Sequence, residues 1–131
     1  MKVLYISHIN EFGGSSKSLI LTIDEIKSKY QELNPIFFVS KGNVEELLKK
    51  KGYKTFSTKW ISIFDNTTYG YYRGIRWLIL LREIFHLPFA FSKLYTILKK
   101  EDIDIVHLND APLFFYAFFI KKFLNKKNIK I

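Results

Sequence analysis

The chain has 131 residues, 48% hydrophobic and 25% charged, which is the composition of one globular domain rather than a disordered protein. It contains no cysteine, which excludes disulfides and thiolate metal sites, and we expect a reducing, cytoplasmic location. The net charge is +9, with ten basic and seven acidic residues in 1–65 but eleven and five in 66–131. This surplus favours anionic partners, although a lysine-rich solvated surface explains it equally well.

Apolar runs and helical patterns alternate along the first half of the chain. Runs of apolar residues predict strands, whereas apolar residues spaced by three or four predict amphipathic helices. The predicted elements are a strand over Val3–Ser7, a helix over Ser16–Tyr30, a strand over Pro35–Ser40, a short helix over Val44–Lys51 and a weak strand over Tyr53–Ser57.

The second half begins with an irregular segment over residues 58–74, followed by a long helical pattern over Ile75–Lys100. Pro88 is expected to kink or split this helix, because proline lacks a backbone donor. The remaining predicted elements are a strand over Ile103–Leu108, a helix over Ala111–Leu124 and the start of a fifth strand at Asn128–Ile131.

Alternating strands and helices predict right-handed βαβ units, and therefore an α/β, Rossmann-like three-layer sandwich with a mostly parallel sheet. We expect residues 1–131 to form one such domain, truncated at the fifth strand. Ligands of such sheets bind at the carboxyl ends of the strands. The candidate site therefore lies where the loops 8–16, 40–43, 58–74 and 107–112 meet.

The loop after the first predicted strand ends in two glycines and opens a helix without acidic residues in its first turn. Free N–H groups at a helix start attract phosphate, and glycine lets a ligand approach the backbone. A plain tight turn is the alternative. Neither a dinucleotide fingerprint nor a P-loop is present, because the required glycines and the acidic residue are missing. The candidate diphosphate-binding residues are Gly13, Gly14, Ser15, Ser16 and Lys17.

His107, Asn109 and Asp110 lie at the carboxyl end of the fourth predicted strand. Alternation places His107 and Asn109 on the same side, where they would hydrogen-bond a polyol such as a sugar acceptor. The alternative is a helix cap by Asn109 or Asp110, which we favour for Asp110 because Ala111 and Pro112 follow it. The other histidines lie far apart in the sequence, and no metal site is expected.

The default interpretation of two aromatic-rich segments is that they form part of the buried core; they are Trp77–Phe91 and Leu113–Phe123. Cations border both pieces, which also suits docking on an anionic membrane surface. Nucleic-acid binding is not expected, because no reader motif accompanies the charge. The longest uncharged run, Ala111–Ile120, has ten residues, whereas a membrane span needs about 20. The bordering cations are Arg73, Arg76, Arg82, Lys121, Lys122, Lys126 and Lys127.

Three segments in order resemble the N-terminal domain of family-four glycosyltransferases of the two-domain GT-B fold. Met1–Leu19 is similar to the family's opening strand, its loop ending in F-G-G and its first helix. Phe38–Lys54 resembles the next strand, glycine-containing loop, leucine-rich helix and K-G turn. Asp104–Pro112, DIVHLNDAP, resembles the family's D-I-V-H-x-[HN] segment.

The resemblance implies sugar transfer from a nucleotide-sugar donor to a glycan or lipid-linked acceptor, in cell-surface polysaccharide or glycolipid synthesis. It places Gly13 and Gly14 near the donor diphosphate and His107 and Asn109 toward the acceptor, with no cofactor. Family members often have Glu-Arg where Ser16 and Lys17 stand.

In that family the donor-binding residues lie in a C-terminal domain, which residues 1–131 do not include. We therefore expect an acceptor-side half, inactive alone, located in the cytoplasm or peripherally on the inner face of the membrane. Two alternatives stay open. One is a non-catalytic module that docks on a membrane or a partner, and the other is a nucleotide-binding regulatory domain.

Overall fold

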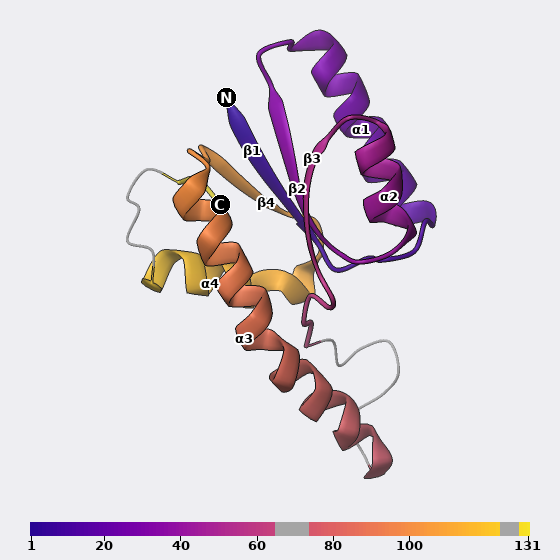
Figure 1. The fold of residues 1–131 in the computed structure, drawn as a ribbon, viewed down its shortest axis with the longest axis vertical. Coiled ribbons are helices and arrows are strands. Elements are labelled where there is room, and N and C mark those ends of the chain that lie inside the picture. The colour runs from indigo at the N-terminus through magenta and orange to yellow at the C-terminus, as the bar shows by residue number, and fades with distance from the viewer. Residues whose placement is uncertain (65–73, 124–128) are drawn as a thin grey trace.

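A four-stranded, fully parallel sheet in the order β3-β2-β1-β4 forms the centre of the molecule (Figure 1). The fold is seen in a computed structural model, which describes residues 1–64, 74–123 and 129–131. The strands are β1 (Lys2–Ser7), β2 (Asn34–Ser40), β3 (Lys54–Thr58) and β4 (Ile105–Leu108). The helices are α1 (Gly14–Lys29), α2 (Asn43–Lys50), α3 (Trp77–Lys100) and α4 (Phe114–Phe123), with 3₁₀ turns η1 (Gly74–Arg76) and η2 (Ala111–Leu113).

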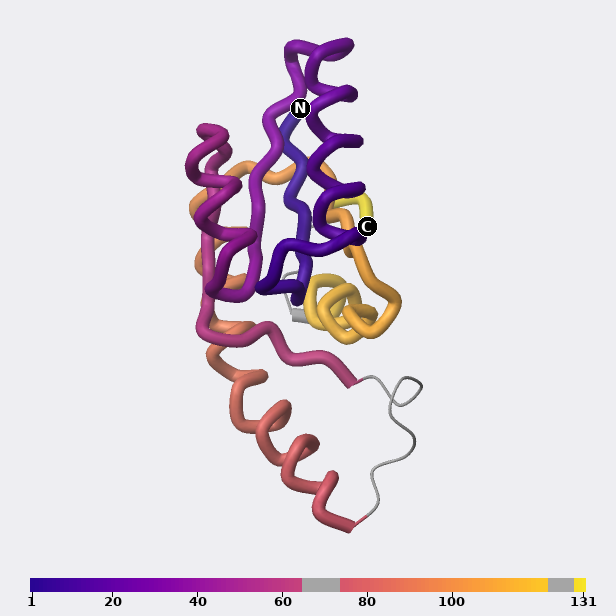
Figure 2. The backbone as a smooth tube through the Cα atoms, turned by 90° about the vertical axis from the view of Figure 1, so that its right-hand side faces the viewer, coloured from indigo at the N-terminus to yellow at the C-terminus, as the bar shows by residue number. Residues whose placement is uncertain are grey.

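Helices cover both faces of the sheet, so the predicted Rossmann-like three-layer class is confirmed (Figures 1 and 2). Successive strand residues point to opposite faces of the sheet, so the continuously apolar strands contribute side chains to two separate cores. One core joins alternate residues of β1 and β2, such as Tyr5 and Phe37, to α1 and α2. The other joins the intervening residues, such as Leu4 and Phe38, to α3 and α4.

The element boundaries differ slightly from the prediction. Helix α1 begins at Gly14 rather than Ser16, because Gly13 is already the extended residue before the helix and its carbonyl accepts the Lys17 N–H at 2.9 Å. The helix predicted from Ala111 opens with a 3₁₀ turn that contains Pro112, and the α-helix proper begins at Phe114.

Pro88 does not split α3, which runs as one 24-residue helix, so of the two expected effects, a kink or a split, the split is wrong. Buried residues on both sides of the proline, Glu83 before it and Ala90 and Leu94 after it, hold the two halves against the same side of the molecule. This packing outweighs the one backbone hydrogen bond that proline removes.

The predicted fifth strand lies partly outside the described residues, which exclude Asn128. Lys130 forms a parallel bridge with Ile105, and its carbonyl accepts the Val106 N–H at 2.8 Å. Because β4 already pairs with β1 through Ile105 and Val3, this bridge lies on the other edge of β4. The predicted strand position is thus confirmed at Lys130.

Candidate functional site

The strand order places a reversal point between β1 and β4. The chain moves from β1 outward through β2 to β3, and α3 then returns it to the opposite side of β1. The loops that follow β1 and β4 consequently lead away in opposite directions from neighbouring strands. Parallel α/β sheets bind ligands in the crevice that such diverging loops leave at the carboxyl edge.

A histidine and a carboxylate meet at this reversal point. His8 directly follows β1 and Asp110 lies two residues past β4, and His8 Nδ1 is 3.0 Å from Asp110 Oδ2. The Asn109 N–H donates to the Ile6 carbonyl at 3.0 Å, which extends the β1–β4 ladder and places Asp110 beside His8. The Asn109 side-chain amide also donates weakly to Asp110 Oδ1, at 3.4 Å.

Asp110 occupies the position before η2, as the capping interpretation requires, but its side chain makes no capping hydrogen bond. The carboxylate contacts His8 instead, so the favoured side-chain cap is wrong. A carboxylate on Nδ1 favours the tautomer in which Nδ1 donates and Nε2 is free to accept a proton. Both side chains are partly open to solvent, at 27% for His8 and 19% for Asp110. The pair is therefore a reachable proton acceptor.

The start of α1 presents backbone donors at the same carboxyl edge. The Gly13 N–H donates to Ser16 Oγ at 2.8 Å, and the Ser16 hydroxyl lies within 3.1 Å of the Gly13 carbonyl and 3.3 Å of the Glu11 carbonyl. Ser16 is also only 3% exposed, so its hydroxyl is already used in hydrogen bonds within the turn. The N–H groups of Gly14 and Ser15 have no hydrogen-bond acceptor within the described part of the chain.

Open space faces the two glycines. A Cβ added at Gly13 or Gly14 would meet no atom within 4 Å. Neither glycine is therefore required by the protein's own packing. Lys17 is exposed in the same turn, and no acidic residue occupies this first turn. The space beside the Gly13 and Gly14 α-carbons is thus open, and the Lys17 cation lies in the same turn, as an anion site at a helix start requires.

Gly42, by contrast, is essential to the loops, and the sequence reasoning assigned it no separate role. A Cβ at Gly42 would lie 2.3 Å from the Asn10 carbonyl oxygen, far inside contact distance. The same carbonyl accepts the Val44 N–H at 3.2 Å. The loop after β1, which carries His8, is thus held directly against the turn that opens α2.

His107 is exposed, and its ring lies 5.3 Å from the Tyr5 ring on the sheet face that α1 and α2 cover. Asn109 contacts Asp110, and within the described residues no hydrogen bond or ring contact joins it to His107. The structure therefore brings Asn109 and Asp110 together with His8, and places His107 at the neighbouring ring of Tyr5.

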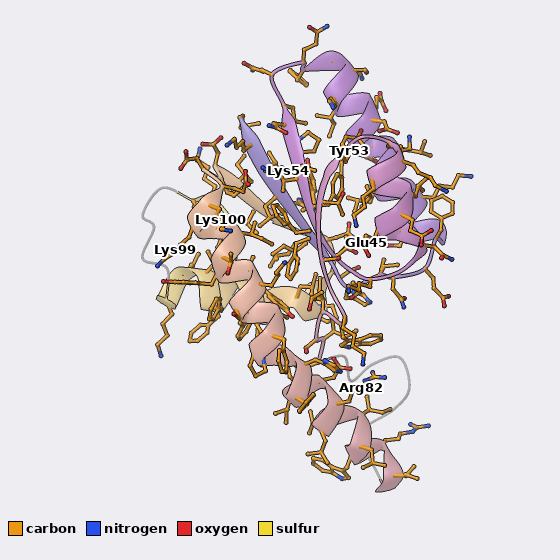
Figure 3. The ribbon with its side chains drawn as sticks, viewed as in Figure 1. Glu45, Tyr53, Lys54, Arg82, Lys99 and Lys100 are labelled. Atoms are coloured by element: carbon orange, nitrogen blue, oxygen red, sulfur yellow. The ribbon has the colours of Figure 1, made fainter. Side chains whose placement is uncertain are left out.

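A buried carboxylate that the sequence reasoning did not single out lies further along this edge. Glu83 of α3 is 1% exposed and accepts hydrogen bonds from Trp60 Nε1 at 2.8 Å and the Ile63 N–H at 3.1 Å through Oε2. Arg82 Nε and Nη2 bind Oε1 at 3.1 and 2.6 Å, and its guanidinium lies 4.4 Å from the Trp60 ring centre. This cluster fastens residues 60–63 to α3 (Arg82 is labelled in Figure 3).

Within the described ranges, no group of three or more His, Asp and Glu side chains is arranged to hold a metal ion. The helices of those ranges also include none with the length and hydropathy needed to traverse a bilayer.

Comparison with known proteins identifies no relative. No family model matches the chain, and neither a curated protein nor a solved structure matches it significantly.

Proposed function

We propose that this chain is the acceptor-side half of a sugar-nucleotide glycosyltransferase. The likeness of Met1–Leu19, Phe38–Lys54 and Asp104–Pro112 to family-four enzymes suggested this activity, and the parallel sheet with its reversal point is compatible with it. The observation that carries the proposal is the pairing of His8 with Asp110 at the edge where the Gly14 and Ser15 amides are open.

The reaction is transfer of a sugar to a hydroxyl of a glycan or lipid-linked acceptor. His8 Nε2 takes the proton of the attacking hydroxyl, while Asp110 holds the ring and stabilises the imidazolium that forms. His107 and Asn109 hydrogen-bond other hydroxyls of the acceptor. General base catalysis of this kind accelerates a reaction by about 10²- to 10⁴-fold.

The leaving group is a nucleoside diphosphate, on which negative charge develops as the sugar departs. The Gly14 and Ser15 amides and the Lys17 ammonium lie at the positive end of α1, where donors stabilise such charge. No metal or cofactor enters this scheme. A second Rossmann-like domain supplies the remaining donor contacts, and the reaction takes place on the cytoplasmic side of the membrane.

Titration of the ¹⁵N-labelled chain with uridine diphosphate tests the anion site. We expect shifts centred on the Gly14, Ser15 and Lys17 amides, and a three- to tenfold weaker affinity in Lys17→Ala. Lys29→Ala, at the opposite end of α1, is the matched control and should bind as the parent does. Shifts that avoid the α1 start would refute the anion site.

Sugar transfer is then measured with the chain alone and with a donor-binding domain added. We expect transfer only from the pair, and a loss of about 10²- to 10⁴-fold in His8→Gln but none in Glu25→Gln, on the exposed side of α1. Transfer by the chain alone would contradict the proposed half site. Full activity in His8→Gln would remove the histidine from the chemistry. Tight nucleotide binding without transfer from any sugar donor would favour the regulatory nucleotide-binding domain instead.

A further inference from the structure

The first half of α3 carries an apolar stripe on its outer side. Leu78, Leu81, Phe85 and Phe89 follow one another at intervals of three or four residues and therefore lie on one helix face. Their exposed fractions are 60%, 60%, 66% and 58%. Figures 1 and 2 show that this half of the helix projects beyond the end of the sheet, where no other helix or strand of the described residues covers it.

The same helix face becomes polar where α3 reaches the sheet. Ser92, Thr96 and Lys99 continue the register of the stripe and are exposed (Lys99 is labelled in Figure 3). The opposite face of this second half packs into the core through Leu94, Ile97 and neighbours. The second half is thus an ordinary surface helix, and the projecting half is apolar on the side that faces away from the core.

The charges around the stripe are of one sign. Residues 74–100 contain five cations, and their single acid, Glu83, is buried against Arg82. The exposed charge of this segment is therefore entirely positive. Helix α4 carries Lys121 and Lys122, and the Lys122 ammonium lies 5.3 Å from the centre of the exposed Phe118 ring. Of these five cations, Arg76 and Arg82 belong to the projecting half, where Arg82 also pairs with Glu83, whereas Lys93, Lys99 and Lys100 belong to the half that packs on the sheet.

A cavity of about 270 Å³ opens beside the stripe and shares two of its residues. Phe85 and Phe89 line it together with Thr58, Lys59 and His86. Apolar rings and a lysine therefore line the same hollow, next to the exposed stripe. That combination suits an amphiphilic anion, whose acyl chain contacts the rings while its phosphate meets the ammonium.

We propose that the projecting half of α3 docks in the interface of an anionic lipid bilayer, with the stripe toward the acyl chains and the cations toward the headgroups. A second copy of the chain is a poorer occupant, because the stripe of one copy would bring like charges against the other. Apolar residues bordered by cations are the composition of helices that lie in membrane interfaces. This inference does not depend on the proposed sugar transfer.

Co-sedimentation with vesicles tests the docking surface. The chain should pellet with an equal mixture of phosphatidylcholine and phosphatidylserine, but not with phosphatidylcholine alone, and the binding should weaken as salt is raised. Trp77, which is 56% exposed at the start of α3, should show a blue-shifted emission on the anionic vesicles that Trp77→Phe abolishes.

Two variants separate the apolar and charged contributions. Phe85→Ser with Phe89→Ser should lower partitioning at least tenfold, whereas Leu21→Ser, on the exposed side of α1, should leave it unchanged. Arg76→Glu, at the start of the projecting half, should lower partitioning about tenfold, and Lys50→Glu on α2 is its control. Far-ultraviolet circular dichroism and urea unfolding check that each variant is folded.

Three results would overturn the proposal. Equal partitioning onto neutral and anionic vesicles would remove the role of the cations. Binding that Phe85→Ser with Phe89→Ser reduces no more than Leu21→Ser does would place the contact elsewhere. A dimer that binds neither vesicle, and that becomes a monomer in the double variant, would show that a second copy covers the stripe.

Discussion

Replacing Glu83 with glutamine should destabilise the protein, because the Glu83 carboxylate is 1% exposed and accepts four hydrogen bonds. Its Oε2 serves Trp60 and Ile63, and its Oε1 serves Arg82. Glutamine offers one oxygen and one NH₂ group in the same place. One of the two sets of donors must therefore face another donor.

The size of the effect depends on which set loses its acceptor. If Trp60 and Ile63 lose their acceptor, two partly buried N–H groups are left unpaired, and each costs about 1–3 kcal/mol. Loss at Arg82 costs less, about 1 kcal/mol, because that side chain is 49% exposed and water can take its place. We expect glutamine to turn its NH₂ toward Arg82, and therefore to lower the free energy of unfolding by about 1 kcal/mol. Glu83→Ala, which removes both acceptor oxygens and leaves all four donors without them, should lower it by about 3–5 kcal/mol.

Urea unfolding, followed by tryptophan fluorescence and circular dichroism, measures both variants. Glu25→Gln is the matched control, because its i,i+4 pair with Lys29 is more than half exposed and is worth less than about 0.5 kcal/mol. A Glu83→Gln protein within 0.5 kcal/mol of the parent, a limit on the order of that surface pair, would refute the role of this carboxylate in fastening residues 60–63 to α3.

Four further predictions concern the loops, the pH dependence and the long helix. Gly42→Ala should lower the free energy of unfolding, measured by urea titration, by about 1–3 kcal/mol, because its Cβ would lie 2.3 Å from the Asn10 carbonyl oxygen. Gly14→Ala is the control, and it should leave the free energy of unfolding unchanged because its Cβ would meet no atom within 4 Å. Burial and the hydrogen bond to Asp24 raise the pKa of Tyr53 from 10.0 to about 12. The protonated phenol therefore stabilises the fold fully below pH 10.0, and this stabilisation is lost as pH rises through about 12. Tyr53→Phe should abolish the alkaline loss, measured as Tm against pH. Partial burial raises the pKa of Asp24, but hydrogen bonds from Lys51 and Tyr53 outweigh it and lower the pKa below 3.8. The stability that the ionised Asp24 contributes is therefore lost as pH falls from 3.8 through the pKa of the folded state. Asp24→Asn should flatten this acidic part of the curve of Tm against pH. Pro88→Ala should raise Tm, with a gain of about 1–3 kcal/mol, because an exposed proline inside α3 removes a helix hydrogen bond; a loss of stability would mean that the ring has a packing role.

Much of the architecture follows from the sequence alone. Continuously apolar strands such as Pro35–Ser40, separated by helical patterns, require helices on both faces and therefore a parallel sheet. The same alternation predicts that the loop after Ser7 and the loop after Leu108 lie at the carboxyl edge. Local spacing is sufficient for these conclusions, because strand and helix periods differ and each element buries its own apolar side.

Other features depended on which strands become neighbours. The contact between His8 and Asp110 spans 102 positions of the sequence and exists only because β4 pairs with β1. Glu83 meets Trp60 for the same kind of reason, because α3 crosses back over the loop that follows β3. The interpretation of Trp77–Phe91 as core also failed in part, because a segment apolar on every side has no period to show which side is covered. Periodicity identifies the elements and their apolar sides, whereas the tertiary structure alone decides which of those sides stay open and which distant side chains meet.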